Sequence, residues 1–470
     1  MSADLERMFE AAGRHADTYP LAELTEVRRR GARRKRIRAA VASGAAVLVI
    51  LAGAGVVWQR RHAEPILPAT TPARVRGMEP VGEPLRAPAG STWDTARVAG
   101  DRGYGLTTSP DSRVYATGAA SWVSESFGEL GYDEGPIAAP ETLIVRTGTA
   151  LLFHDPGTGT RRWELPTGGD DRFELYTGLI VRIDGGSHAV EAFDVVTGAR
   201  LWSVPPGDDR PAELAGMRTA ADPGEIDPAG GGPFGQTKFA KAFPLTGDRL
   251  AVVTTGGVVA IRDVRTGELV SSVPAAPAMP GTAVAYDGVV YTVSRAGDGT
   301  REVHATGATS SRVVFGDRRA FTGSFPCGTA RLCVYEQRDS GTYLLVVDAA
   351  DGRVVRETPF PYDPGVSSAR LGRIVVSTTS GTGQRTVILG ADGRVLADVP
   401  GVGGFIDDGN VLALVRDDAT GRFTAVGISA VDGRQIPLGT MPEISGRCDW
   451  SADRLACPAG SELWTWRFVR

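Results

Sequence analysis

From residue 95 to its end, the chain alternates between short apolar runs and clusters of turn-forming residues. In LAVVTTGGVVAIRDVRTGELVSSV (250–273), apolar residues recur at every second position on both sides of a Thr-Gly pair. This alternation is typical of β-strands with one buried face, and glycine permits the positive φ of a tight turn. The pattern predicts many short antiparallel strands.

One hairpin sequence recurs along this region. FDVVTGARLW (193–202) and HDPGTGTRRW (154–163) share an aspartate, a Thr-Gly pair and a closing tryptophan. Partial copies lie at RDVRTGELV (262–270), HATGATSSRVVF (304–315), VDAADGRVV (347–355), LGADGRVL (389–396) and SAVDGRQI (429–436). The residues that define the turn motif are Asp155, Gly159, Trp163, Asp194, Gly198, Trp202, Asp263, Gly267, Asp348 and Gly352. We expect the aspartate to bond to the turn backbone and the tryptophan to cap the gap between neighbouring units.

The spacing of these hairpins indicates a repeat architecture. Successive turn glycines are separated by 39, 69, 40, 45, 41 and 40 residues. A period near 40 with short strands is typical of a propeller, in which sheets that cannot bury both faces alone pack in a ring. The one long interval contains residues 205–235, a stretch rich in Pro, Gly and Asp that we interpret as a surface insertion.

The pattern Asp-x-x-Thr-Gly-x-x-x-Trp resembles the repeat of the pyrroloquinoline quinone (PQQ) enzyme-like β-propellers, over roughly residues 95–470. The resemblance implies an all-β propeller. The chain ends at DRLACPAGSELWTWRFVR (453–470), where a last turn and outer strand would be expected. We therefore predict that a segment near Pro80–Val98 supplies this strand and closes the ring. Seven turns and this composite blade make an eight-bladed propeller, with a seven-bladed ring as the alternative.

The most apolar segment precedes the repeats. Residues 39–57 carry no charge, and 19 residues of helix span about 28 Å, close to the thickness of the hydrocarbon core of a bilayer. Trp58 follows at the interface, and RRRGARRKRIR (28–38) holds eight cations. The positive-inside rule predicts a cytoplasmic tail (1–38), a transmembrane α-helix (39–58) and an extracytoplasmic remainder. The charged flanks disfavour a buried core helix, and the long basic region disfavours a cleaved signal peptide.

The regions beside this segment differ in composition. Residues 59–90 contain six prolines and predict a semi-rigid linker, followed by the propeller at 91–470. Residues 2–27 carry short amphipathic stretches, which suit either a disordered tail or a peptide that docks a cytoplasmic partner. The layout resembles membrane-anchored anti-sigma-like regulators in architecture alone.

The net charge of −4 conceals an asymmetry. Residues 1–38 hold ten Lys/Arg and six Asp/Glu, so this tail is basic and the remaining chain is acidic. Binding to nucleic acid requires a basic surface, and we therefore expect no nucleic-acid partner.

The four cysteines form two local pairs, in FPCGTARLC and CDWSADRLAC. Each pair lies across the first hairpin of its own repeat. The placement and the extracytoplasmic topology predict disulfides Cys327–Cys333 and Cys448–Cys457, with free buried thiols as the alternative. The spacing does not suit zinc.

Candidate chemistry is sparse. The enzymes of the resembled family carry adjacent cysteines over the quinone, and no such pair occurs here. The three histidines of the repeat region lack metal-ligand spacing, and His154 is interpreted as a turn residue. The acidic pairs Asp170-Asp171, Asp208-Asp209, Asp407-Asp408 and Asp417-Asp418 lack the spacing of a calcium loop and are interpreted as solvated. We expect no cofactor, no metal and no catalytic residue.

These observations predict a single-pass protein of the cell membrane whose propeller is a non-catalytic module that binds protein or cell-envelope ligands. The first alternative is a transmembrane regulator with a propeller sensor and a signalling tail. The second is a propeller enzyme, quinone-dependent or hydrolytic.

Overall fold

A computed structural model describes residues 73–107, 112–116, 122–124, 136–219, 225–226, 244–317, 321–362, 366–380, 383–390 and 392–470. The predicted cytoplasmic tail, the predicted transmembrane helix and residues 59–72 of the predicted linker lie outside them. The described residues include no helix long and apolar enough to cross a membrane.

The strands are short, and they pair antiparallel in groups, mostly of four strands consecutive in the chain, that form the blades. Blade 1 consists of β3 (Thr95–Ala99), β4 (Arg102–Thr107), β5 (Arg113–Ala116) and β6 (Trp122–Val123), and blade 2 of β7 (Ile137–Ala138), β8 (Leu143–Arg146), β9 (Ala150–His154) and β10 (Arg161–Pro166). Blade 3 consists of β11 (Arg172–Tyr176), β12 (Leu179–Ile183), β13 (Val190–Asp194) and β14 (Arg200–Val204), and blade 4 of β15 (Pro211–Arg218), β17 (Arg249–Thr254), β18 (Val258–Asp263) and β19 (Leu269–Pro274). Blade 5 consists of β20 (Val284–Tyr286), β21 (Val289–Arg295), β22 (Arg301–Thr306) and β23 (Ser311–Asp317).

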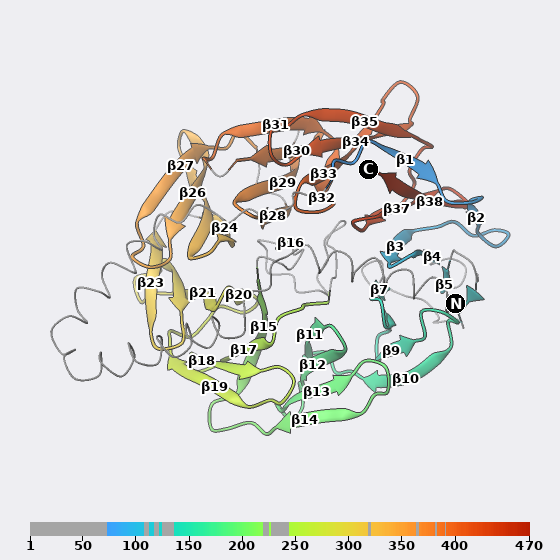
Figure 1. Ribbon diagram of the computed structural model, residues 1–470. Helices are drawn as coiled ribbons and strands as arrows, with labels where there is room; N and C mark the ends of the chain where they lie inside the picture. Colours follow the sequence, from blue (N-terminus) through green and yellow to red (C-terminus); the bar gives the residue numbers. More distant parts are fainter. Residues whose placement is uncertain are drawn as a thin grey trace, which may run out of the picture. The chain divides into compact units, whose positions relative to one another are not determined.

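Blades 6 to 9 continue the pattern. Blade 6 consists of β24 (Phe321–Gly328), β25 (Arg331–Arg338), β26 (Gly341–Asp348) and β27 (Val354–Pro359), and blade 7 of β28 (Val366–Arg370), β29 (Arg373–Ser380), β30 (Gly383–Leu389) and β31 (Val395–Pro400). Blade 8 consists of β32 (Val402–Phe405), β33 (Asn410–Arg416), β34 (Phe423–Ser429) and β35 (Gln435–Met441). Blade 9 consists of β36 (Asp449–Trp450), β37 (Arg454–Ala459) and β38 (Glu462–Val469), with β1 (Gly77–Pro80) and β2 (Leu85–Arg86) paired to β38. In each blade the first strand is innermost and the last lies at the rim (Figure 1).

The core is divided among the interfaces between blades. Nine hydrophobic clusters of the described residues each join two consecutive blades. One of them packs Trp93, Ala96 and Val98 against Ala456 and Leu463, and so joins blade 9 to blade 1. Because every neighbouring pair shares a cluster, the blades form a closed ring, which is a β-propeller.

The ring closes through the predicted composite blade. β1 pairs with β38 from Gly77↔Val469 to Pro80↔Trp466, and β2 continues this outer strand at Leu85↔Leu463. The closing strand therefore lies at residues 77–86, at the start of the predicted range. The predicted linker (59–90) includes these residues, but β1 and β2 belong to blade 9. The propeller therefore begins before the predicted boundary at residue 91. Val75 is also buried in the core between blades 8 and 9.

The described residues form nine blades, so the prediction of eight, or alternatively seven, is wrong. The unrecognised blade is the first, β3–β6. Its strands lie within residues 95–123. There YATGAASW (115–122) repeats only the Thr-Gly pair of the motif, as the weak copy at 304–315 does, and the count of seven turns omits it.

The structure also changes the bounds of the predicted surface insertion (205–235), because part of it forms a strand of blade 4. Residues 211–218 form β15, the inner strand of blade 4, and the extra residues fall between β15 and β17. Within them β16 (Glu225–Ile226) pairs with β28, the inner strand of blade 7. β15 also pairs in parallel with β20, which joins blades 4 and 5 into one eight-stranded sheet.

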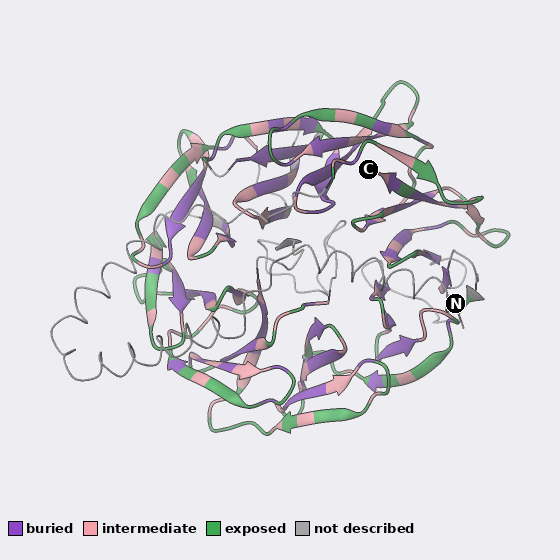
Figure 2. Cartoon of the chain, in the orientation of Figure 1, coloured by how far each residue is buried: buried purple, intermediate pink, exposed green. Residues whose placement is uncertain are grey.

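Burial follows the radius of the ring. The inner and middle strands are buried almost throughout, whereas the rim strands alternate between exposed and partly buried positions (Figure 2). The rim strand β27, for example, has the pattern exposed, exposed, partly buried, exposed, partly buried, exposed. The alternating pattern of the sequence is therefore a property of the rim strands, which pack on one side only.

Candidate functional site

The ring presents two faces, which we name by their connections. The turn face carries the hairpins between the first and second strands and between the third and fourth strands of each blade. These two hairpins are bonded to each other, as in Val195 N to Gly178 O (3.2 Å) and Ala430 N to Gly409 O (2.9 Å). The loop face carries the hairpins between the second and third strands and the connections between blades.

The recurring motif forms the outer hairpins of the turn face. In blade 3 the Asp194 Oδ1 atom accepts hydrogen bonds from the Val196 and Thr197 amides and from the Thr197 hydroxyl. Burial raises the pKa of Asp194, but these hydrogen bonds outweigh burial, so its pKa lies below the usual value. Gly198 has φ of 72°, as the turn requires. Asp155 and Asp263 cap their turns in the same way.

The tryptophans of the motif bind the turn of the next blade. Trp163 Nε1 donates to the Val195 carbonyl (3.0 Å), and Trp202 Nε1 donates to the Val264 carbonyl (2.9 Å). These acceptors directly follow Asp194 and Asp263. The tryptophans therefore fasten consecutive blades together, which confirms their interpretation as packing residues.

Where the tryptophan is missing, other side chains reach the same carbonyl. Tyr104 Oη donates to Pro156 O (3.3 Å), Arg312 Nε to Ala349 O (3.1 Å) and Arg373 Nε to Ala430 O (3.2 Å). Tyr104 and Arg373 lie on second strands and Arg312 on a fourth strand, so no single sequence spacing could reveal them. Blades 1, 5 and 7 thus keep this contact with the next blade through a different donor.

The turn glycines leave room for these contacts. A Cβ atom at Gly198 would lie 2.6 Å from the Trp163 ring, and one at Gly267 would lie 2.7 Å from Trp202. At Gly393 the neighbour is Arg356, whose Cδ would lie 2.4 Å away. Glycine is therefore required at these turns for packing as well as for positive φ.

Acidic side chains brace the loop face. Asp171 accepts hydrogen bonds from the Gly168 and Gly185 amides, and Asp209 accepts from the Gly256 amide and the Thr254 and Thr255 hydroxyls. Each aspartate thereby ties the connection that precedes its blade to that blade's middle hairpin. Glu213 reaches the next blade, where it accepts from the Gly281 and Ala283 amides.

These contacts correct the interpretation of the acidic pairs as solvated for Asp171, Asp209, Asp407 and Asp408, whereas Asp170, Asp208, Asp417 and Asp418 are exposed as expected. Asp171 and Asp407 are each only 8% exposed. Asp407 accepts from the Gly409 and Asn410 amides, and Asp408 pairs with Arg370. No group of three or more metal-ligating side chains occurs in the described part of the chain.

Two further acids link inner strands. Asp449 on β36 accepts from the Val98 amide on β3 (2.8 Å), next to the half-buried Arg97. Glu174 on β11 faces Gly216 on β15, and burial raises the pKa of Glu174 to about 7 although Arg218 and the Gly216 amide lower it. Both acids join neighbouring blades near the axis of the ring.

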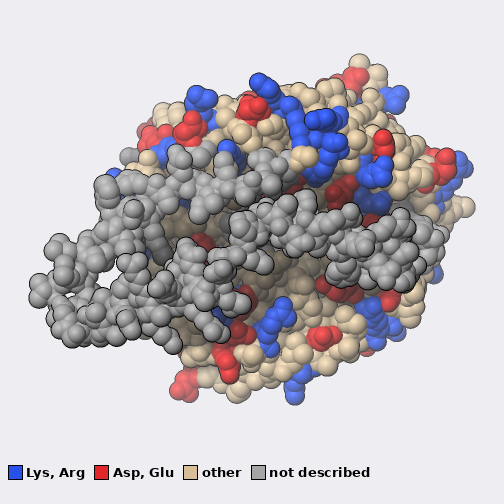
Figure 3. Space-filling view, in the orientation of Figure 1, with Lys and Arg blue, Asp and Glu red and all other residues tan. Residues whose placement is uncertain are grey.

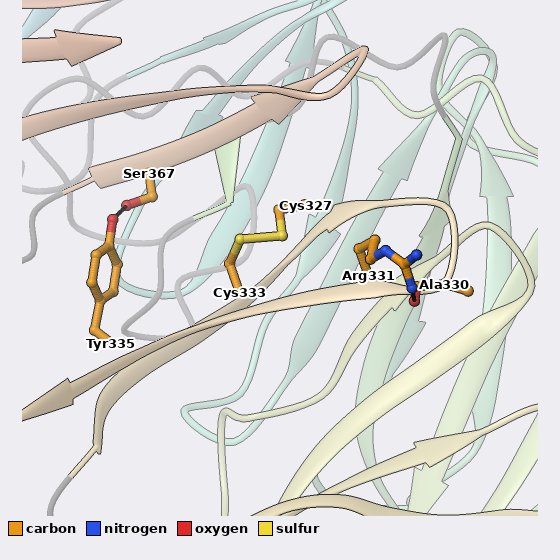
Figure 4. The surroundings of a disulfide bond; sticks show 6 residues. All are labelled: Cys327, Ala330, Arg331, Cys333, Tyr335 and Ser367. Carbon is orange, nitrogen blue, oxygen red and sulfur yellow. Dashed lines mark hydrogen bonds between the residues drawn. A yellow bond between two sulfur atoms is a disulfide. The ribbon is translucent and has the colours of Figure 1, made fainter. Parts of the chain in front are cut away.

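Both predicted disulfides are present. Cys327–Cys333 bridges the β24–β25 hairpin (Figure 4). Cys448–Cys457 bridges the hairpin of β36 and β37. Each closes the innermost hairpin of its blade. Such disulfides indicate an oxidising, extracytoplasmic compartment for this domain.

Two histidines of the ring, His154 and His304, form hydrogen bonds within their own blades. His154 is buried, and its Nδ1 donates to the Gly159 carbonyl (3.0 Å) across the turn. His304 Nε2 lies 2.8 Å from Ser294 Oγ and 3.5 Å from Glu302 Oε2. Serine and carboxylate thus meet the same nitrogen, whereas a Ser-His-acid triad requires them on opposite nitrogens.

Charges of both signs are interspersed around the rim on the face drawn in Figure 3. Within the blades, ion pairs include Arg182–Glu191 (2.6 Å), on the middle strands of blade 3, and Arg385–Asp398 (2.6 Å) in blade 7.

Solved structures similar to this chain include several propellers. BamB from Moraxella catarrhalis is 16% identical, with 72% of this chain and 96% of that chain covered and a TM-score of 0.38. The computationally designed Ika8 protein is 10% identical, with 83% and 100% covered and a TM-score of 0.43. The WD40 domain of SCAP from fission yeast is 8% identical, with 83% and 97% covered and a TM-score of 0.39.

No family model and no curated protein matches the sequence. The propeller assignment therefore rests on the ring of blades and the nine clusters that join them.

Proposed function

We propose that this protein is a membrane-anchored, extracytoplasmic, non-catalytic propeller that binds a protein or cell-envelope ligand on its loop face. The observation that carries the proposal is the bracing of that face by Asp171, Asp209 and Glu213. Loops fixed before binding lose less conformational entropy when a ligand docks, and rigid loops on a closed ring suit recognition. The charge-free segment at residues 39–57 supplies the anchor.

The polar groups of the described ring also suit this role. The buried acids Glu213, Asp171 and Asp407 hold backbone amides, and the tryptophans hold neighbouring blades. These side chains maintain the shape of the ring and are not available for acid–base chemistry. Recognition by shape and hydrogen bonding is therefore favoured over an enzyme.

The test is in-cell crosslinking and affinity capture with two matched variants of blade 4. Asp209→Ala removes a brace on the loop face, and Asp263→Ala removes a turn cap on the turn face. We expect capture of extracytoplasmic partners to fall with Asp209→Ala and to persist with Asp263→Ala. Equal capture by both variants would contradict binding at the loop face.

A transmembrane regulator is the second candidate, favoured by the amphipathic stretches of residues 2–27. A version lacking residues 2–27 keeps the basic run that sets topology. A cytoplasmic partner captured by the full-length protein and lost from this version would establish the regulator; identical partners would leave the propeller as the functional part.

A further inference from the structure

The start of the described chain is fixed on the turn face. The Val75 amide donates to Asn410 Oδ1 (3.0 Å), and Asn410 Nδ2 and Arg470 Nη1 donate to the Ala73 carbonyl (3.2 and 2.8 Å). Asn410 begins β33, directly after the first hairpin of blade 8. Arg74 also bonds to the Arg434 carbonyl in the outer turn of the same blade (2.9 Å). Ala73 is therefore held at the turn face beside blades 8 and 9.

The preceding sequence limits how far this point can be from a membrane. The charge-free segment ends at Val57, and residues 58–72 connect it to Ala73. An extended chain spans at most about 3.6 Å per residue, so 15 residues reach roughly 50 Å. This step rests on the membrane anchor of the proposed function.

The rim of the turn face carries exposed aliphatic side chains on five consecutive blades. They lie within the first three residues of the outer strands, next to the turns. They are Leu201 (47% exposed), Leu269 (54%), Val270 (51%), Val313 (46%), Val354 (43%), Val355 (37%) and Val395 (53%). The seven side chains repeat at the same end of neighbouring rim strands, so that one broad surface could contact all of them.

Exposed arginines lie beside these aliphatic residues. The outer turns of blades 6, 7 and 8 read Asp-Gly-Arg and end in Arg353, Arg394 and Arg434. The Arg394 and Arg434 side chains are 80% and 77% exposed. Asp351, Asp392 and Asp432 each accept a hydrogen bond from the arginine's own amide, and Asp392 and Asp432 also lie 3.6 and 3.2 Å from the arginine Nε atoms. The Arg394 and Arg434 side chains are thus ion-paired with aspartates of their own exposed turns, and Arg74 lies beside the turn of blade 8, where it bonds to the Arg434 carbonyl.

We propose that the turn-face rim, defined by these seven aliphatic residues with Arg353, Arg394 and Arg434, rests on the anionic lipid surface of the membrane that anchors the chain. The groups are spread over neighbouring blades of one rigid ring, which suits a broad planar partner. A protein partner would require a compact, well-packed centre. Aliphatic side chains at the depth of the headgroups and arginines beside anionic lipids both favour this contact. The loop face is then directed away from the membrane, toward external ligands.

Full-length protein in nanodiscs tests the contact by hydrogen–deuterium exchange. The discs contain phosphatidylcholine alone or mixed with phosphatidylglycerol. We expect slower exchange in residues 353–357 and 394–398 in the anionic discs. The triple variant R353Q/R394Q/R434Q should lose this protection, since each arginine near an anionic surface contributes about a fivefold factor in affinity. The matched control R295Q/R416Q/R422Q changes three arginines on the loop face and should retain it.

The outcomes separate this contact from the anchor. A protein that alkaline carbonate releases from membranes has no transmembrane anchor, and the proposed function fails with it. An anchored protein with identical exchange in both discs and in detergent overturns the lipid contact alone. Protection that appears only in native envelope vesicles would identify a protein partner and would also overturn it.

Discussion

The indole ring of Trp163 lies over Gly198, the turn glycine of the next blade, and its Nε1 donates to the Val195 carbonyl of the same turn. Two copies of one motif therefore recognise each other: the closing tryptophan of one hairpin fits the glycine of the following hairpin. Adjacent blades are coupled through backbone groups that every copy of the turn possesses. This explains how the contact persists when the tryptophan is replaced.

Replacing Gly198 with alanine should destabilise the ring by about 2–4 kcal/mol, because positive φ and contact with the indole both oppose a Cβ atom. Gly198 has φ of 72°, and the added atom would lie 2.6 Å from Trp163. Gly207→Ala is the control, since no atom lies within 4 Å of its Cβ position. Thermal melts followed by circular dichroism measure both; equal melting temperatures would refute the packing role.

Replacing Arg312 with methionine should cost about 1–3 kcal/mol, because the buried Ala349 residue loses the donor to its carbonyl. Methionine keeps the length of the aliphatic stem, so the change reports mainly on the hydrogen bond. Arg353→Met, at an exposed turn position of blade 6, should change stability by less than about 0.5 kcal/mol. Chemical denaturation gives both values. If the two variants behave alike, arginine does not substitute for tryptophan in this contact.

The stability of the ring should fall between pH 4.5 and 7 because of Glu174. Burial raises its folded-state pKa from 4.5 to about 7, so the folded protein holds this proton more tightly than the unfolded chain does. The stabilisation that this pKa difference gives the folded protein is on the order of 3 kcal/mol. It is complete below pH 4.5 and is lost as pH rises through 7. Glu174→Gln should flatten this part of the profile of melting temperature against pH. The exposed Glu164→Gln should leave the profile unchanged.

A version that starts at Ser91 should aggregate, whereas one that starts at Leu67 should remain monodisperse in size-exclusion chromatography. Removal of β1 and β2 leaves β38 as an open edge and uncovers the cluster around Trp466 and Phe468. A monodisperse protein starting at Ser91 would show that the outer strand of blade 9 is dispensable.

Non-reduced, unfolded protein should incorporate no alkylating reagent, and reduced protein should incorporate four equivalents, as measured by intact mass. Both disulfides close short loops, of sequence separation 6 and 9. The loop-entropy relation gives about 2–3 kcal/mol for each, with slightly more for Cys448–Cys457. Paired Cys→Ala variants should follow this order in melting temperature. Alkylation without reduction would contradict the oxidised state.

Much of the fold follows from the sequence alone. The alternating apolar pattern, the turn glycines and the period near 40 residues determine antiparallel blades, because these features act over a few neighbouring residues. The cysteine pairs are equally local, and their pairing was predicted correctly. The sequence also predicted that another segment of the chain completes the last blade, because the third strand of that blade would otherwise be an unpaired edge.

Tertiary structure alone decided how the blades are joined and counted. Blade 1 retains only the Thr-Gly pair of the motif, in YATGAASW (115–122), and the packing of Tyr104 and Leu106 against Leu143 and Val145 of blade 2 establishes it as a blade. The donors Tyr104, Arg312 and Arg373 reach their carbonyls across a blade interface, over separations of 37 to 57 residues. Contacts between elements distant in sequence leave no fixed spacing, so no local pattern encodes them. The turn face and the loop face form only when the ring closes. Only the closed ring therefore shows that the start of the described chain lies on the turn face.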